Sequence, residues 1–197
     1  MIPRIIKDFK RSTNEPKKID VLPADLRAGL RYGRQKALFA YWEKIKGAYP
    51  MPSRADFDPV DIPKLLPFIG LIDIIQPGPM FRYRVVGTVM SARFSQPQDG
   101  RFVQEATTPD YGAYLVRVYT LPYRLKTPVH ITERTGFSMG YEEIYSRLML
   151  PLGRDRKTPD MILCSALSDN ADYPELDNTM LDPRSVAALE VVALKVA

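Results

Sequence analysis

The chain has 197 residues, of which 45% are hydrophobic and 26% are charged, values that exclude a disordered or fibrous chain and favour one globular domain with extensions. No apolar run approaches the roughly 18 residues of a membrane helix, and charge appears too early in the N-terminus for a secretory signal. We therefore expect a cytoplasmic protein. Because Cys164 is the only cysteine, an intrachain disulfide and a cysteine-based metal cluster are excluded.

The formal net charge of +5 is concentrated near the N-terminus. Residues 1–48 contain 12 Lys and Arg against 5 Asp and Glu, so the remainder is nearly neutral. We expect residues 1–22 to form a loosely ordered basic arm, because their charges are scattered among Pro and Asn. An adaptor that contacts nucleic acid or a membrane surface through this arm is an alternative function.

An amphipathic helix is predicted over residues 25–46, where apolar residues recur at steps of three, four and seven. Together with a proline-rich crossing it makes up residues 23–65. We expect a homodimer whose interface is formed by one apolar stripe of this helix, namely Leu38, Tyr41, Trp42 and Ile45. The alternative is a monomer in which the helix packs on the chain's own sheet.

Five strands are predicted, over residues 69–75, 81–88, 128–137, 143–152 and 161–167. The first and last strands are apolar on both faces, as central strands are. In the second strand apolar and polar residues alternate, as they do in an edge strand. A helix that starts at Pro109 separates the second strand from the third.

This order predicts an α+β fold over residues 66–169, with a five-stranded antiparallel sheet of order 2-1-5-4-3 and helices on one face. Residues 170–197 are predicted to form a linker and a C-terminal helix that starts at Asp182-Pro183, which would join the homodimer. Helices then flank the sheet at both ends of the chain.

Five short motifs occur in order, and they are Tyr41-Trp42, the segment 52–59, Leu66-Pro67, the segment 82–88 and Leu150-Pro151-Leu152. With them, the chain from about Leu38 to Asp169 resembles the single-domain PAS proteins common in alphaproteobacteria. The resemblance implies a sensory or regulatory domain that binds a small molecule or a partner protein and signals through its flanking helices. At residues 96–101 the chain departs from the family's usual Asp-x-Thr-Gly-Arg, so no polar ligand contact is carried over through this loop.

No enzymatic activity is expected, because no nucleophile motif, phosphate loop or metal-spaced ligand set occurs. His130 is the only histidine and is predicted at the surface, so we expect no haem. The segment 99–104 faintly resembles the flavin-binding motif of light-sensing PAS domains. Gly100 stands there in place of the reactive cysteine, which excludes a flavin–thiol adduct.

The concave face of the sheet is the expected ligand site. Its candidate binding residues are Arg82, Tyr83, Arg84, Phe94, Arg101, Phe102, Tyr114 and Val118. The three arginines would suit an anionic ligand. If the aromatic side chains fill the interior, the domain is instead a ligand-free interaction or dimerisation module, and in either case the signalling partner is unidentified.

Overall fold

A computed structural model describes residues 21–23, 26–92, 94, 96–136, 142–168 and 187–193. Most of the expected basic arm (residues 1–20) and of the expected linker (residues 170–186) lies outside the described residues.

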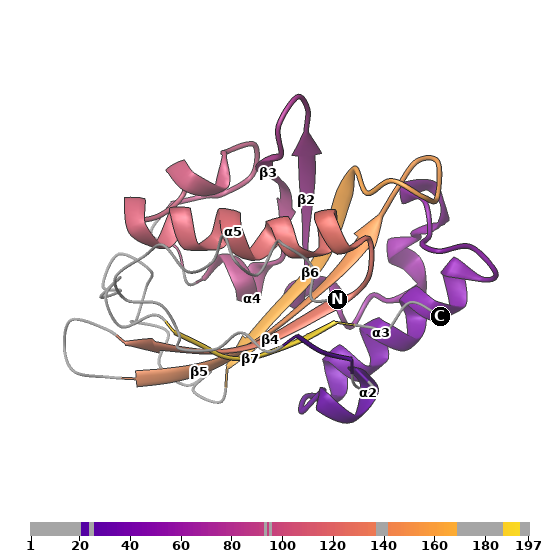
Figure 1. Ribbon diagram of the computed structural model, residues 1–197, viewed down its shortest axis with the longest axis horizontal. Helices are drawn as coiled ribbons and strands as arrows, with labels where there is room; N and C mark the ends of the chain where they lie inside the picture. Colours follow the sequence, from indigo (N-terminus) through magenta and orange to yellow (C-terminus); the bar gives the residue numbers. More distant parts are fainter. Residues whose placement is uncertain are drawn as a thin grey trace.

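One sheet organises the described residues, in the order β1-β7-β4-β5-β6-β2-β3 (Figure 1). Its strands are β1 (Val21–Pro23), β2 (Gly70–Ile75), β3 (Met80–Val86), β4 (Val129–Gly136), β5 (Glu142–Leu152), β6 (Met161–Ser168) and β7 (Ala187–Ala193). All neighbouring strands are antiparallel except β1 and β7. Strands β2 to β6 follow the predicted order 2-1-5-4-3, which confirms that prediction.

Strands β7 and β1 extend the sheet beyond the five predicted strands. The C-terminal helix predicted over residues 183–197 is wrong for residues 187–193, because they pair with β4. This segment is apolar at nearly every position, and such a run has no periodicity that separates a helix from a strand. Residues 187–193 form a strand because the edge of β4 presents backbone N–H and C=O groups that need hydrogen-bond partners.

Helices cover both faces of the sheet and not only one, as Figure 1 shows. On one side lie α4 (Thr88–Ser91) and α5 (Pro109–Leu125), and on the other lie α2 (Leu26–Gly29) and α3 (Gly33–Lys46). The predicted helix 25–46 is therefore broken at residues 30–32, between two glycines that weaken a helix. Two apolar cores result, one on each face of the sheet.

The interface predicted for a homodimer is wrong, because its residues are buried within one chain. Leu38, Tyr41 and Trp42 are 1%, 7% and 0% exposed, and Ile45 packs against the same core. The Trp42 Nε1 donates a hydrogen bond to the Pro151 carbonyl at 2.9 Å, which ties α3 to β5. The stripe of α3 thus covers the chain's own sheet.

Short 3-10 turns cross from α3 to β2, at Arg54–Asp56, Pro59–Asp61 and Leu66–Phe68, and a further one lies at Val103–Glu105. Ser53 and Asp56 form a capping box, and the Asp58 carboxylate accepts from the Val60 N–H at 2.9 Å. At the end of β3 the chain meets the last of the crossing turns. A Cβ on Gly87 would lie 2.3 Å from the Leu66 carbonyl oxygen, so only glycine fits.

Replacing Trp42 by Ala should lower the free energy of unfolding by about 3–5 kcal/mol, because it empties a fully buried site and removes the bond to Pro151. Urea denaturation followed by far-UV circular dichroism measures this. The control is Val60→Ala at a site that is 81% exposed, where we expect a change within about 0.5 kcal/mol. Unchanged stability together with a lower mass by light scattering would show that Trp42 packs between chains.

Candidate functional site

A cavity of about 370 Å³ lies between the sheet and the helices α4 and α5. Its size falls within the range of about 300–1,000 Å³ found for small-molecule sites. Seven aromatic side chains dominate its walls, and they are Tyr32, Phe68, Tyr83, Phe94, Tyr111, Tyr119 and Tyr145. The aromatic residues therefore do not fill the interior completely.

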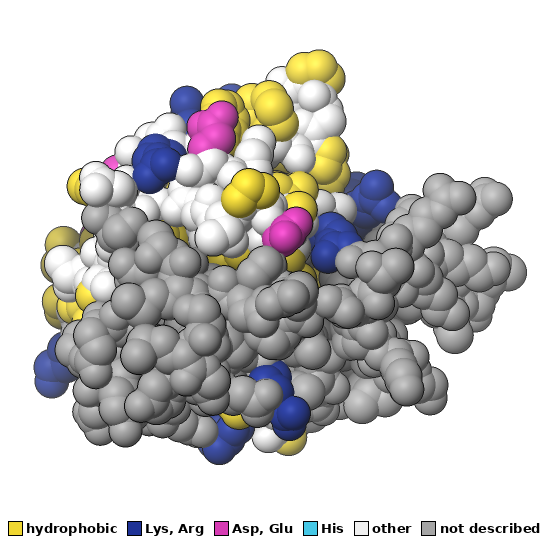
Figure 2. All heavy atoms as spheres, turned by 90° about the vertical axis from the view of Figure 1, so that its left-hand side faces the viewer, with side chains coloured by type: hydrophobic (Ala, Val, Ile, Leu, Met, Phe, Trp, Pro, Cys, Tyr) yellow, Lys and Arg dark blue, Asp and Glu magenta, His cyan; other side chains and the backbone are white. Residues whose placement is uncertain are grey.

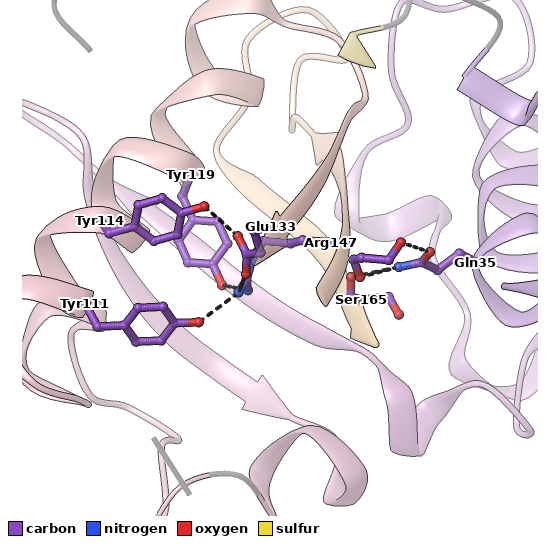
Figure 3. Close-up of polar contacts among 8 residues, drawn as sticks. Gln35, Tyr111, Tyr114, Tyr119, Glu133, Arg147 and Ser165 are labelled. Carbon is purple, nitrogen blue, oxygen red and sulfur yellow. Dashed lines mark hydrogen bonds and ion pairs between the residues drawn. The ribbon is translucent and has the colours of Figure 1, made fainter. Parts of the chain in front are cut away.

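An ion pair between Arg147 and Glu133 lies buried beside this cavity, in the layer between the sheet and α5 (Figure 3). The Arg147 Nη2 donates to the Glu133 Oε1 at 2.6 Å and to the Tyr111 hydroxyl at 3.1 Å, and the Nη1 donates to the Tyr119 hydroxyl at 3.3 Å. Tyr114 donates to the other Glu133 oxygen at 2.7 Å. Three tyrosines of α5 thus converge on one pair of opposite charges.

Strand register and helical spacing bring these groups together. Ile131 of β4 stands opposite Arg147 of β5, and Glu133 stands opposite Tyr145, so both charges point to the α5 face of the sheet. On α5, residues 111, 114 and 118–119 recur at helical spacing and share the buried face.

Burial raises the pKa of Tyr83 to about 12 and also raises the pKa values of Tyr111, Tyr114 and Tyr119, so all four hydroxyls keep their protons near neutral pH. Burial alone would lower the pKa of Arg147, but the charge of Glu133 offsets this and raises the pKa above its usual value. Arg147 therefore keeps its positive charge.

A second buried polar cluster lies on the opposite face of the sheet and joins it to α3 (Figure 3). The Gln35 Nε2 donates to the Ser146 carbonyl at 2.8 Å, and the Ser146 hydroxyl donates to the Gln35 Oε1 at 2.7 Å. The prediction that His130 is at the surface is wrong. It is 1% exposed and contacts the Ser146 hydroxyl through Nε2 at 2.7 Å, because α2 and β7 cover the strand that was expected to face solvent.

Of the eight predicted ligand-binding residues, Tyr83 and Phe94 line the cavity. Tyr114 and Val118 are buried in the core next to it without lining it. Phe102 lies outside the cavity lining, where it forms an isolated bridge to β3.

The three predicted arginines lie away from the cavity. Arg82 and Arg84 share Asp73, at 3.1 Å and 2.7 Å, beside a second hollow of about 600 Å³ on the outer face of β2 and β3. Arg101 bonds the Glu105 carbonyl. On the described part of the face in Figure 2, Lys and Arg side chains occur in several places and do not form one continuous patch.

Sequence reasoning missed Arg147, Glu133, Tyr111 and Tyr119. The sequence did contain a signal for the two charged residues. Each lies two positions along its strand from an apolar residue that faces the core, and alternate residues of a strand face the same side of the sheet. Glu133 continues the series Val129 and Ile131, and Arg147 precedes Met149.

None of the described helices is long and apolar enough to cross a membrane. The sequence pattern that defines the PAS domain matches residues 30–166. No curated protein matches the chain.

The solved structures that are similar to this chain include two of a LOV protein. The crystal structure of a Rhodobacter sphaeroides LOV protein has a TM-score of 0.40 at 12% identity, covering 71% of this chain and 72% of that chain. A variant of RsLOV has a TM-score of 0.39 at 13% identity, covering 66% and 69%.

Replacing Glu133 by Gln should lower the free energy of unfolding by about 3–5 kcal/mol, because the buried Arg147 loses its counter-charge. The double variant Glu133→Leu with Arg147→Met removes both charges and should cost less than the single change. Urea denaturation of the two variants and the unaltered chain decides this. A double variant less stable than Glu133→Gln would mean that the pair is not coupled in this way.

Stability should fall as pH is lowered from neutral, in part because of His130. Burial lowers the His130 pKa from 6.5 to about 4, so between these values the unfolded chain takes up a proton that the folded chain does not. The stability from this group is present above pH 6.5 and is lost toward pH 4, by at most about 3 kcal/mol.

His130→Gln cannot titrate, so its stability should depend less steeply on pH across this window. Chemical denaturation at a series of pH values for both proteins measures the difference. Equal slopes would show that His130 is not the titrating group.

Proposed function

Because the chain belongs to the PAS domain family, we propose that it is a signalling sensor in which a small molecule bound in the cavity alters the packing of helix α3. The observation that carries this proposal is that residues at the start of α3 form part of the cavity wall. A ligand there contacts the sheet and a flanking helix at once.

Two residues make this contact between α3 and the cavity. Tyr32, at the N-cap of α3, and Arg34, in its first turn, both line the cavity. The Arg34 guanidinium lies 4.1 Å from the centre of the Phe68 ring, which also lines it. Any ligand that displaces Phe68 or pairs with Arg34 therefore acts directly on the helix.

Strand β5 offers a second connection. Ser146 and Arg147 are consecutive, so they point to opposite faces of the sheet. Arg147 lines the cavity, and Ser146 is hydrogen-bonded to Gln35 of α3. A small shift of β5 caused by the ligand reaches the polar contacts that hold α3.

The proposal is one of binding without catalysis, in a cytoplasmic setting, with the output supplied by a partner protein. It involves neither haem nor a flavin–thiol adduct. The only histidine, His130, faces away from the cavity, and the only cysteine, Cys164, is buried and does not line it.

Filling the cavity tests the proposal. The fluorescent apolar anion 1-anilinonaphthalene-8-sulfonate should bind the folded chain and raise its melting temperature. Ala166→Phe, which places a ring in the cavity, should reduce this binding at least about tenfold. The control is Ala40→Phe, because Ala40 is exposed on α3 and does not line the cavity.

Hydrogen exchange of residues 33–46 gives the second readout. Bound dye should change exchange in α3, and Gln35→Leu should weaken this response while dye still binds. Dye binding that Ala166→Phe leaves unaltered would favour the ligand-free interaction module.

A further inference from the structure

We propose that the ligand is a monocarboxylate with an apolar body, and that its carboxylate accepts a hydrogen bond from the Arg147 Nε. This inference rests on the proposed function and specifies its ligand class. It concerns a side chain that sequence reasoning did not select.

The charges that face the cavity are of one sign. Among the described residues that line it, Arg34 and Arg147 carry charge, and neither Asp nor Glu is present. Glu133 is paired with Arg147 and does not line the cavity. An anionic group is therefore attracted, and a cationic group would have no acidic partner there.

Arg147 still has a donor to offer. Its two terminal nitrogens are used by Glu133, Tyr111 and Tyr119. Its Nε has no hydrogen-bond partner among the described residues, although the side chain is only 5% exposed. A buried donor without an acceptor is costly, so an oxygen placed at this nitrogen is strongly favoured. The Tyr111 hydroxyl accepts from Arg147, and its own proton remains available for the same ligand.

The charges of the cavity lining favour a ligand with one carboxylate over a ligand with two. Glu133 neutralises Arg147, and within the described part of the chain Arg34 is in contact with the Phe68 ring but forms no ion pair. One positive charge is thus left to be balanced. The remaining walls include Val89, Met90 and Leu115, and they require an apolar body.

The test compares 4-phenylbutanoate with 4-phenylbutanamide, which have the same shape and differ in charge. By isothermal titration calorimetry the carboxylate should bind at least about tenfold more tightly, equivalent to about 1.4 kcal/mol. Arg34→Gln, at an exposed site, should reduce this preference severalfold, because it weakens binding of the carboxylate more than binding of the amide. High salt should weaken the carboxylate more than the amide.

Arg147 is tested with both buried charges removed, in Glu133→Gln with Arg147→Met, so that no unpaired charge is left in the core. The carboxylate should lose its advantage in this variant while the uncharged 4-phenylbutanamide still binds. If this variant does not fold, Arg147→Lys takes its place, because it keeps the charge beside Glu133 and lacks the Nε donor. An undiminished preference for the carboxylate in that variant overturns the assignment.

Equal affinity for carboxylate and amide, in a cavity that Ala166→Phe closes to the dye, would overturn the carboxylate assignment and leave the proposed sensor intact. Failure of 4-phenylbutanoate to bind overturns the assignment as well. Dye binding that does not respond to Ala166→Phe overturns the proposed function itself.

Discussion

The ion pair between Arg147 and Glu133 is the contact on which the α5 side of the molecule depends. Two full charges lie in an apolar layer, and they are tolerated there because they are 2.6 Å apart and surrounded by tyrosine hydroxyls. The pair fixes the rotation of α5, since three of its tyrosines must reach the same two side chains. It also holds a guanidinium that lines the cavity.

Strand β5 connects this layer to the opposite one. Ser146 joins the cluster of Gln35 and His130 under α3, and Arg147 joins the cluster under α5. Both clusters are polar islands in otherwise apolar cores. Such islands favour one arrangement of the packed elements, because any slippage leaves a buried donor or acceptor without its partner. Strand β4 also contributes to both clusters, through His130 and Glu133, so the two faces of the sheet are joined through β4 and β5.

The motifs that carry the resemblance to PAS proteins prove to be structural. Trp42 binds the carbonyl of Pro151, Asp56 and Asp58 cap the turns of the crossing, and Gly87 meets Leu66. Each motif either contacts another motif or stabilises the turns of the segment that connects two of them. They identify the family and the fold for that reason, and of the five motifs the segment 82–88 reaches the cavity, through Tyr83 and Thr88. Two of the eight predicted ligand residues, Tyr83 and Phe94, line the cavity.

Strand order, the central places of β2 and β6 and the edge position of β3 followed from the sequence alone, because alternation and apolar runs report directly on how many faces of a strand are covered. Other features depended on contacts between distant segments. Residues 187–193 form a strand because they pair with the edge of β4. His130 is buried because α2 and β7 cover its strand, and Leu38 and Trp42 pack on the chain's own sheet and not on a second chain. The local sequence pattern predicts that a side chain is buried. Only the tertiary structure determines which element buries it, because the residues that bury one side chain come from elements far apart in the sequence.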